Sequence, residues 1–146
     1  MGLTMDTGEG VAAGELRRAS ISLAPVPTSV SMARSFVSTM LETWDCDDPE
    51  RIVALLTSEI VTNAVKRATG TVRVEAALVS DEALRVEASD DHPDVPYPHR
   101  PEPHAQGGRG ILLVQELALR WGVDREERHK VVWFEAPVVP RRSRCR

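Results

Sequence analysis

The stretch LLTSEIVTNAVKRA, residues 55–68, decides how the whole sequence is interpreted, because it reads as a helix with two polar groups among its apolar positions. At about 100° per residue, Glu59 and Asn63 fall within about 40° of each other. The apolar positions expected in the same arc are Ile52, Leu55, Leu56 and Ile60. Burying an unpaired carboxylate is costly, so a Glu in such an arc normally has a partner.

The spacing of Glu59 and Asn63 suits one kind of ligand. Residues at i and i+4 project from the same side of a helix, so a carboxylate and an amide both offer hard oxygen atoms there. Magnesium takes one or two protein oxygens and fills its remaining positions with phosphate and water. A carboxylate beside the ion would orient or deprotonate an attacking nucleophile. The alternative is that Glu59 and Asn63 are polar residues of the core whose side chains are capped or paired by other groups of the protein.

The composition fits one globular domain without a nucleic-acid or membrane partner. With 146 residues, of which 42% are hydrophobic and 27% charged, the chain resembles neither a disordered nor a membrane protein. The net charge of −4 argues against nucleic acid or an anionic membrane as the main partner. Cys46 and Cys145 form neither a disulfide framework nor a CxxC pair. Because no membrane span or signal peptide is recognisable, we expect a cytoplasmic protein.

Periodicity and turn residues divide the chain into segments. A flexible leader is expected over 1–18, a domain over 19–138 and a basic tail over 139–146. Helices are expected over 29–44, over 49–67 with Asp48 as its N-cap, and from near Arg109. Strands are expected over 20–27, 71–79, 83–89, 118–124 and 130–139, the second and third forming a hairpin. The tryptophans Trp44, Trp121 and Trp133 occupy apolar positions and are expected in the core.

A glycine-rich turn, GGRG at 107–110, precedes the third expected helix. Glycines let the backbone approach a ligand closely, and the free N–H groups of a helix start attract an anion. A plain loop-to-helix connection is an equally common reading of such a turn. The long Pro-rich loop before it, residues 91–106, favours the anion site, because long loops in compact domains are usually functional.

Asp90 ends an expected strand and opens this long loop. A carboxylate at that position would accept a hydrogen bond from the amino group of adenine, and an Asx turn is the alternative. His92, His99 and His104 lie in the same loop, but their spacing lacks the order of a zinc site.

Together these segments resemble the GHKL (Bergerat-fold) ATPase domain, in the branch of anti-sigma-factor serine/threonine kinases common in actinobacteria. The resemblance covers roughly residues 20–137. LLTSEIVTNAVKRA resembles the N box of that family, VEASDDHPDVP (86–96) its adenine-binding box, and GGRGILLVQELALRWGV (107–123) its second glycine box. ARSFVSTMLETW (33–44) resembles the helix before the N box, and KVVWFEA (130–136) the closing strand. Motifs in this order form a specific signature.

The resemblance implies a two-layer α/β sandwich, with a mixed β-sheet and helices on one face. It implies ATP and Mg²⁺ as cofactors, with Glu59 as the catalytic base, Asn63 as the magnesium ligand and Asp90 as the adenine contact. The residues expected at the phosphates are Gly108, Arg109 and Gly110. It also implies kinase activity on a STAS-type anti-sigma antagonist and binding to a sigma factor, and it leaves a homodimer open.

Two departures from the family pattern keep a second hypothesis in view. Arg67 stands where the family usually has His, and Asp90 is followed by DHPD instead of the glycines of D-x-G-x-G. Glu59 and Asn63 favour a kinase that regulates a sigma factor. The missing glycines favour a partner-binding module that responds to nucleotide, or works without it, and does not transfer a phosphoryl group.

Overall fold

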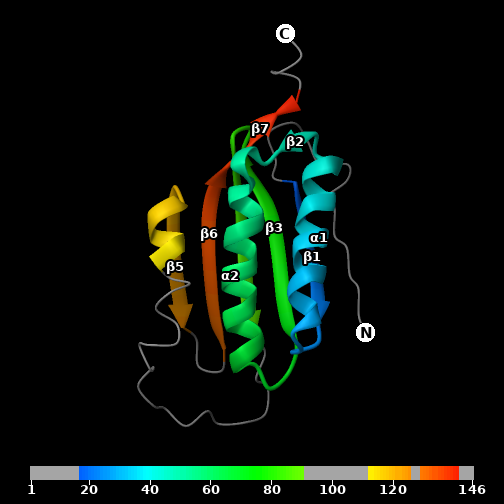
Figure 1. Cartoon of the computed structure of the whole chain (residues 1–146), viewed down its shortest axis with the longest axis vertical. Helices are drawn as coiled ribbons and strands as arrows, with labels where there is room; N and C mark the ends of the chain where they lie inside the picture. The colour runs from blue at the N-terminus through cyan, green and yellow to red at the C-terminus, as the bar shows by residue number, and fades with distance from the viewer. Residues whose placement is uncertain (1–16, 91–111, 126–128, 142–146) are drawn as a thin grey trace.

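The computed structural model describes residues 17–90, 112–125 and 129–141, and Figure 1 shows their arrangement. The long helices are α1 (Thr28–Thr43) and α2 (Ile52–Arg67), the second preceded by a 3-10 turn over Pro49–Arg51. Residues 112–117 are also helical. The strands are β1 (Arg18–Leu23), β2 (Cys46–Asp47), β3 (Val72–Ser80), β4 (Ala83–Asp90), β5 (Arg120–Arg125), β6 (Lys130–Pro137) and β7 (Val139–Pro140). Over these described ranges, no helix has both the length and the apolar character needed to cross a membrane.

The main sheet has five strands in the order β1-β3-β4-β6-β5, and a small second sheet pairs β2 with β7. Both long helices cover the same face of the main sheet (Figure 1). The two-layer α/β sandwich with helices on one face is therefore confirmed. The sheet differs from the expected mixed arrangement, because its four strand pairings are all antiparallel. Two helices, rather than one, connect β1 to β3, so the chain returns to the end where β1 finished and β3 runs the opposite way.

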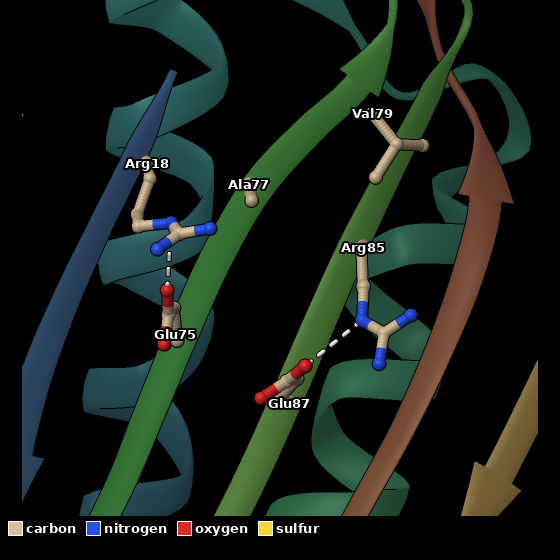
Figure 2. A pocket seen from close by; sticks show the side chains of 6 residues that line it. All are labelled: Arg18, Glu75, Ala77, Val79, Arg85 and Glu87. Atoms are coloured by element: carbon tan, nitrogen blue, oxygen red, sulfur yellow. Dashed lines mark hydrogen bonds and ion pairs between the residues drawn. The ribbon is translucent and has the colours of Figure 1, made fainter. Parts of the chain in front are cut away.

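Alternation along the strands separates the two faces of the sheet. On β4, Leu84 and Val86 are buried on the helix side, whereas Arg85 and Glu87 lie on the opposite face and form an ion pair at 2.8 Å. Figure 2 shows a pocket on that opposite face, lined by Arg18, Glu75, Ala77, Val79, Arg85 and Glu87. Partly exposed ion pairs add little stability, so the apolar core between sheet and helices holds the fold together.

Trp133 lies on the charged face rather than in the core. On β6 its neighbours Val132 and Phe134 are buried on the helix side, so Trp133 must point the other way. The guanidinium of Arg85 lies 3.9 Å from the centre of its ring, a cation–π contact. Gly122 on β5 leaves room for the indole, because a Cβ atom there would lie 2.7 Å from Trp133. The expectation of a core position was wrong because the apolar run VVWF hides which residues alternate inward.

The start of α2 is held by Asp48. Its carboxylate oxygens accept hydrogen bonds from the backbone N–H groups of Val53 at 2.9 Å and Ala54 at 3.0 Å. Between the cap and the helix, Glu50 and Arg51 adopt left-handed conformations, with φ of 59° and 56°. The single helix expected from residue 49 is therefore a 3-10 turn followed by α2. Arg51 rather than Asp48 is the residue in the N-cap position of α2. The side chain of Asp48 nevertheless satisfies two of the donors that the helix start leaves free.

The last described residues attach to the connection between the long helices. Nε of Arg141 donates to Asp47 at 2.9 Å, and Nη2 donates to Glu42 at 3.0 Å. The backbone N–H of Arg141 donates to the carbonyl of Asp45 at 2.9 Å. Ordered pairing thus continues past residue 138, into the segment expected as the basic tail. These contacts hold the segment that directly precedes Asp48.

Replacing Asp48 with Ala should destabilise the fold by about 1–2 kcal/mol, because two N–H groups at the start of α2 lose their acceptors. Urea denaturation followed by circular dichroism measures the free energy of unfolding. Asp81→Ala, in the exposed turn between β3 and β4, is the control and should change that free energy by less than about 0.5 kcal/mol. Equal losses in the two variants would contradict the role of Asp48 as a cap.

Candidate functional site

Glu59 and Asn63 lie at the edge of the buried stripe of α2. The stripe consists of Val53, Leu56, Thr57, Ile60, Val61 and Ala64. Glu59 and Asn63 are half-buried beside it, one helical turn apart. Leu55, expected in the same apolar arc, is instead 40% exposed. The sheet covers a narrower arc than the sequence suggested, so the polar pair borders the apolar stripe rather than interrupting it.

The polar pair faces away from α1. Ser58 marks the α1 side of the helix, because its hydroxyl accepts a hydrogen bond from Nη1 of Arg34 at 2.9 Å. At about 100° per residue, Glu59 lies about 100° and Asn63 about 140° around α2 from Ser58. In Figure 1 the helical segment 112–117 lies on the opposite side of α2 from α1. Glu59 and Asn63 are therefore on the flank of α2 turned toward that segment.

Asp90 ends β4 on the face that the helices cover. It pairs in register with Val72, the first residue of β3, so it lies at the end of the sheet where α2 finishes (Figure 1). The residue is only 6% exposed. Its Oδ1 accepts a hydrogen bond from the backbone N–H of Lys130 at 3.4 Å, which is long. The structure thus brings the buried carboxylate of Asp90 to the same end of the molecule as the last turn of α2.

The oxygen donors of α2 fit a magnesium ion. Within 17–90, 112–125 and 129–141, no three His, Cys, Asp or Glu residues gather closely enough to hold a metal ion by themselves. Glu59 and Asn63 offer a carboxylate and an amide oxygen from successive turns, a small and hard donor set. Magnesium binds through such a set when phosphate and water supply its remaining ligands. The site therefore suits an ion that arrives with a phosphate ligand.

Some of the expected site residues lie outside the described part of the chain. They are Gly108, Arg109 and Gly110 of the glycine-rich turn, and His92, His99 and His104 of the long loop. What we expect of them from the sequence stays a prediction. The helical segment 112–117 follows the glycine-rich turn, as expected.

Two features of this region were not identified as parts of a site from the sequence. The backbone N–H of Lys130 reaches Asp90 because β4 and β6 are neighbours, and no local pattern indicates that pairing. Arg67 continues the series of Glu59 and Asn63 by one more turn and is half-buried at the end of α2.

The chain is similar to a known protein family over most of its length. A family model described as "Histidine kinase-like ATPase domain" matches residues 23–135, from the last residue of β1 into β6. The matched span contains Glu59, Asn63 and Asp90. No curated protein matches the chain significantly.

Proposed function

The chain belongs to the histidine kinase-like ATPase domain family, and on that premise we propose that it is an anti-sigma factor serine/threonine kinase. An ATP-binding regulatory role follows from the family. In our proposal the protein transfers the terminal phosphoryl group of ATP to a hydroxyl of a STAS-type antagonist protein and also binds a sigma factor. We further propose that it acts in the cytoplasm.

The observation that carries the proposal is the position of Glu59 and Asn63 on the flank of α2 turned away from α1. We assign Asn63 to magnesium and Glu59 to the attacking hydroxyl, which it would orient and deprotonate. Bound magnesium would neutralise part of the phosphate charge. Two polar side chains that border an apolar stripe contribute little to packing, which supports a role for them in ligand binding.

We assign Asp90 to the amino group of adenine. The residue is buried on the helix side of the sheet at the end of β4, and the two oxygens of a carboxylate can accept several hydrogen bonds. Because adenine offers a donor where guanine offers an acceptor, a carboxylate at this position favours adenine. Gly108, Arg109 and Gly110 are proposed to bind the phosphates.

A second candidate function is a nucleotide-responsive module that binds a partner without transferring a phosphoryl group. The observation that favours it is the sequence DHPD after Asp90, where the kinase branch has glycines. A nucleotide-responsive module and a kinase both bind nucleotide, so the rate of phosphoryl transfer separates them. A homodimer is compatible with either function.

Asn63→Ala should weaken Mg-ATP binding by about tenfold or more, because the ion loses a protein ligand. Isothermal titration calorimetry at matched magnesium concentration measures the dissociation constant. In magnesium-free buffer with a chelator, wild type and variant should bind ATP equally weakly. Unchanged affinity of the variant in magnesium, with the fold intact by circular dichroism, would remove Asn63 from the site.

Asp90→Asn should reduce the preference for ATP over GTP, because the amide can turn a donor toward the guanine carbonyl. We expect wild type to prefer ATP by about tenfold or more, since a mismatched polar group costs about 1–3 kcal/mol. Competition of unlabelled GTP against a fluorescent ATP analogue measures this ratio. Equal competition by GTP and ATP in the wild type would show that Asp90 does not read the base.

Glu59→Gln should slow phosphoryl transfer by about 10²–10⁴-fold while Mg-ATP binding stays the same or tightens. The substitution keeps the shape and removes a negative charge beside the phosphates. The rate of ATP hydrolysis is the first measurement, and Glu82→Gln in the exposed β3–β4 turn is the control. If wild type binds Mg-ATP, hydrolyses none and phosphorylates no STAS-type antagonist, the partner-binding module becomes the better description.

A further inference from the structure

The strand β5 ends the main sheet with one unpaired edge. In the order β1-β3-β4-β6-β5, the only strand of the described ranges that pairs with β5 is β6. Figure 1 shows β5 as the outermost strand, on the side of the sheet away from α1. Every second residue of a strand turns its N–H and C=O groups toward the same neighbour. The outer edge of β5 therefore presents backbone donors and acceptors to which another strand can pair.

The charges of this edge are complementary to those of an identical edge. The sequence RWGVD, residues 120–124, has Gly122 at its centre. If two copies of β5 pair antiparallel about a twofold axis through Gly122, Arg120 of each copy lies opposite Asp124 of the other. Opposite charges facing each other across a strand pair are stabilising. A shift of the register by one residue would set Arg120 opposite Arg125, so the charges select the first register.

Arg120 and Asp124 point to the face of the sheet that the helices leave open. Gly122 pairs with Trp133 of that face, and residues two positions apart on a strand share a face. Both side chains are exposed, and Nη1 of Arg120 lies 3.5 Å from Glu135 of its own chain. A guanidinium has five N–H donors. Arg120 can therefore keep Glu135 and accept the Asp124 carboxylate of a second copy as a further partner.

The other face of β5 is apolar. Trp121 and Val123 are half-buried there, beside Phe134 and Val132 of β6. In the register centred on Gly122, Trp121 of one copy lies opposite Val123 of the other. Pairs of an aromatic and a β-branched side chain are also favourable across two strands. The same register therefore matches charges on one face and apolar groups on the other.

Exposed apolar side chains precede β5. Of the seven large apolar residues that stand out as exposed within the described ranges, three lie in the eight residues before the strand: Leu112, Leu117 and Leu119. Leu119 is 58% exposed and directly adjoins β5. Extended by one residue, the register sets Leu119 opposite Arg125 of the second copy, whose aliphatic stem can cover it. Exposed apolar groups beside an open strand edge favour contact with another protein surface.

We propose that two copies of this chain form a dimer through β5, which joins their five-stranded sheets into one continuous antiparallel sheet. The second copy is the partner that the observations favour, because both the charges and the apolar residues of 120–124 complement themselves. The twofold axis at Gly122 is perpendicular to the sheet, so the helices of both copies lie on the same side. This inference goes beyond the proposed function, which requires one copy only.

The experiment is sedimentation equilibrium of the full chain from micromolar to millimolar concentration. We expect a reversible equilibrium between monomer and dimer in the wild type. Asp124→Arg should weaken the dimer by about tenfold or more, because two arginines then face each other at both ends of the contact. Arg120→Asp should do the same with two carboxylates. An equimolar mixture of these two variants should dimerise as the wild type does, because each facing pair in the mixed dimer is again opposite in charge.

Asp81→Arg is the matched control. It makes the same change of charge in the exposed turn between β3 and β4, away from β5, and should leave the dimer unchanged. If Arg120→Asp does not fold by circular dichroism, Arg120→Asn replaces it. Its mixed dimer with Asp124→Arg keeps one attractive pair and has no repulsive one, so it should form more tightly than the dimer of Asp124→Arg alone.

Four results would overturn the inference about β5. They are a wild type that stays monomeric throughout, a dimer that Asp124→Arg does not weaken, an equal loss in Asp81→Arg, and a mixture that dimerises no better than its separate components. Each would leave the proposed function intact, since nucleotide binding and phosphoryl transfer are measured independently of the dimer.

Discussion

The packing of α2 against the middle of the sheet is the constraint on which the rest of the structure depends. Leu56 and Ile60 are almost fully buried, and α2 contacts β4 and β6. A helix on a sheet buries one stripe, so residues at the edge of that stripe are half-covered whatever their chemistry. In α2 that edge carries Glu59, Asn63 and Arg67. One packing interaction therefore aligns a carboxylate, an amide and a guanidinium along a single flank.

The two ends of α2 are fixed by different means, and both bear on this flank. At the start, Asp48 accepts hydrogen bonds from two backbone N–H groups, and the left-handed residues Glu50 and Arg51 make the tight approach that this requires. At the other end, a short connection leads to Val72 of β3, which pairs with Asp90. Because both ends are held, α2 cannot slide along β4 without breaking contacts at Asp48. The spacing between its polar flank and Asp90 is thus a property of the fold.

Much of this architecture could be predicted from the sequence, because periodicity reports burial. The repeat of apolar residues in α1 and α2, and the alternation in β3 and β4, depend on one-sided burial that the structure confirms. The 3-10 turn before α2 and the pairing of β2 with β7 could not be predicted, since they depend on residues distant in sequence, such as Arg141 with Asp47. For the same reason the sequence suggested Asp90 but not its contact with Lys130.

The two faces of the sheet differ in how their charged residues are balanced. On the open face, arginines and glutamates neutralise one another in pairs, as Arg85 does with Glu87 and Glu135. On the helix side, Asp90 is buried at the end of a strand and Glu59 borders the core, close to the negative end of α2. A nucleotide added there brings further negative charge, so its binding is favourable only when cations arrive with it or are already in place. In the function we propose, magnesium held by Asn63 meets the first requirement. Under the function we propose, the helix terminus that would repel a bare phosphate makes binding depend on the metal ion, so Mg-ATP is expected to bind more tightly than free ATP.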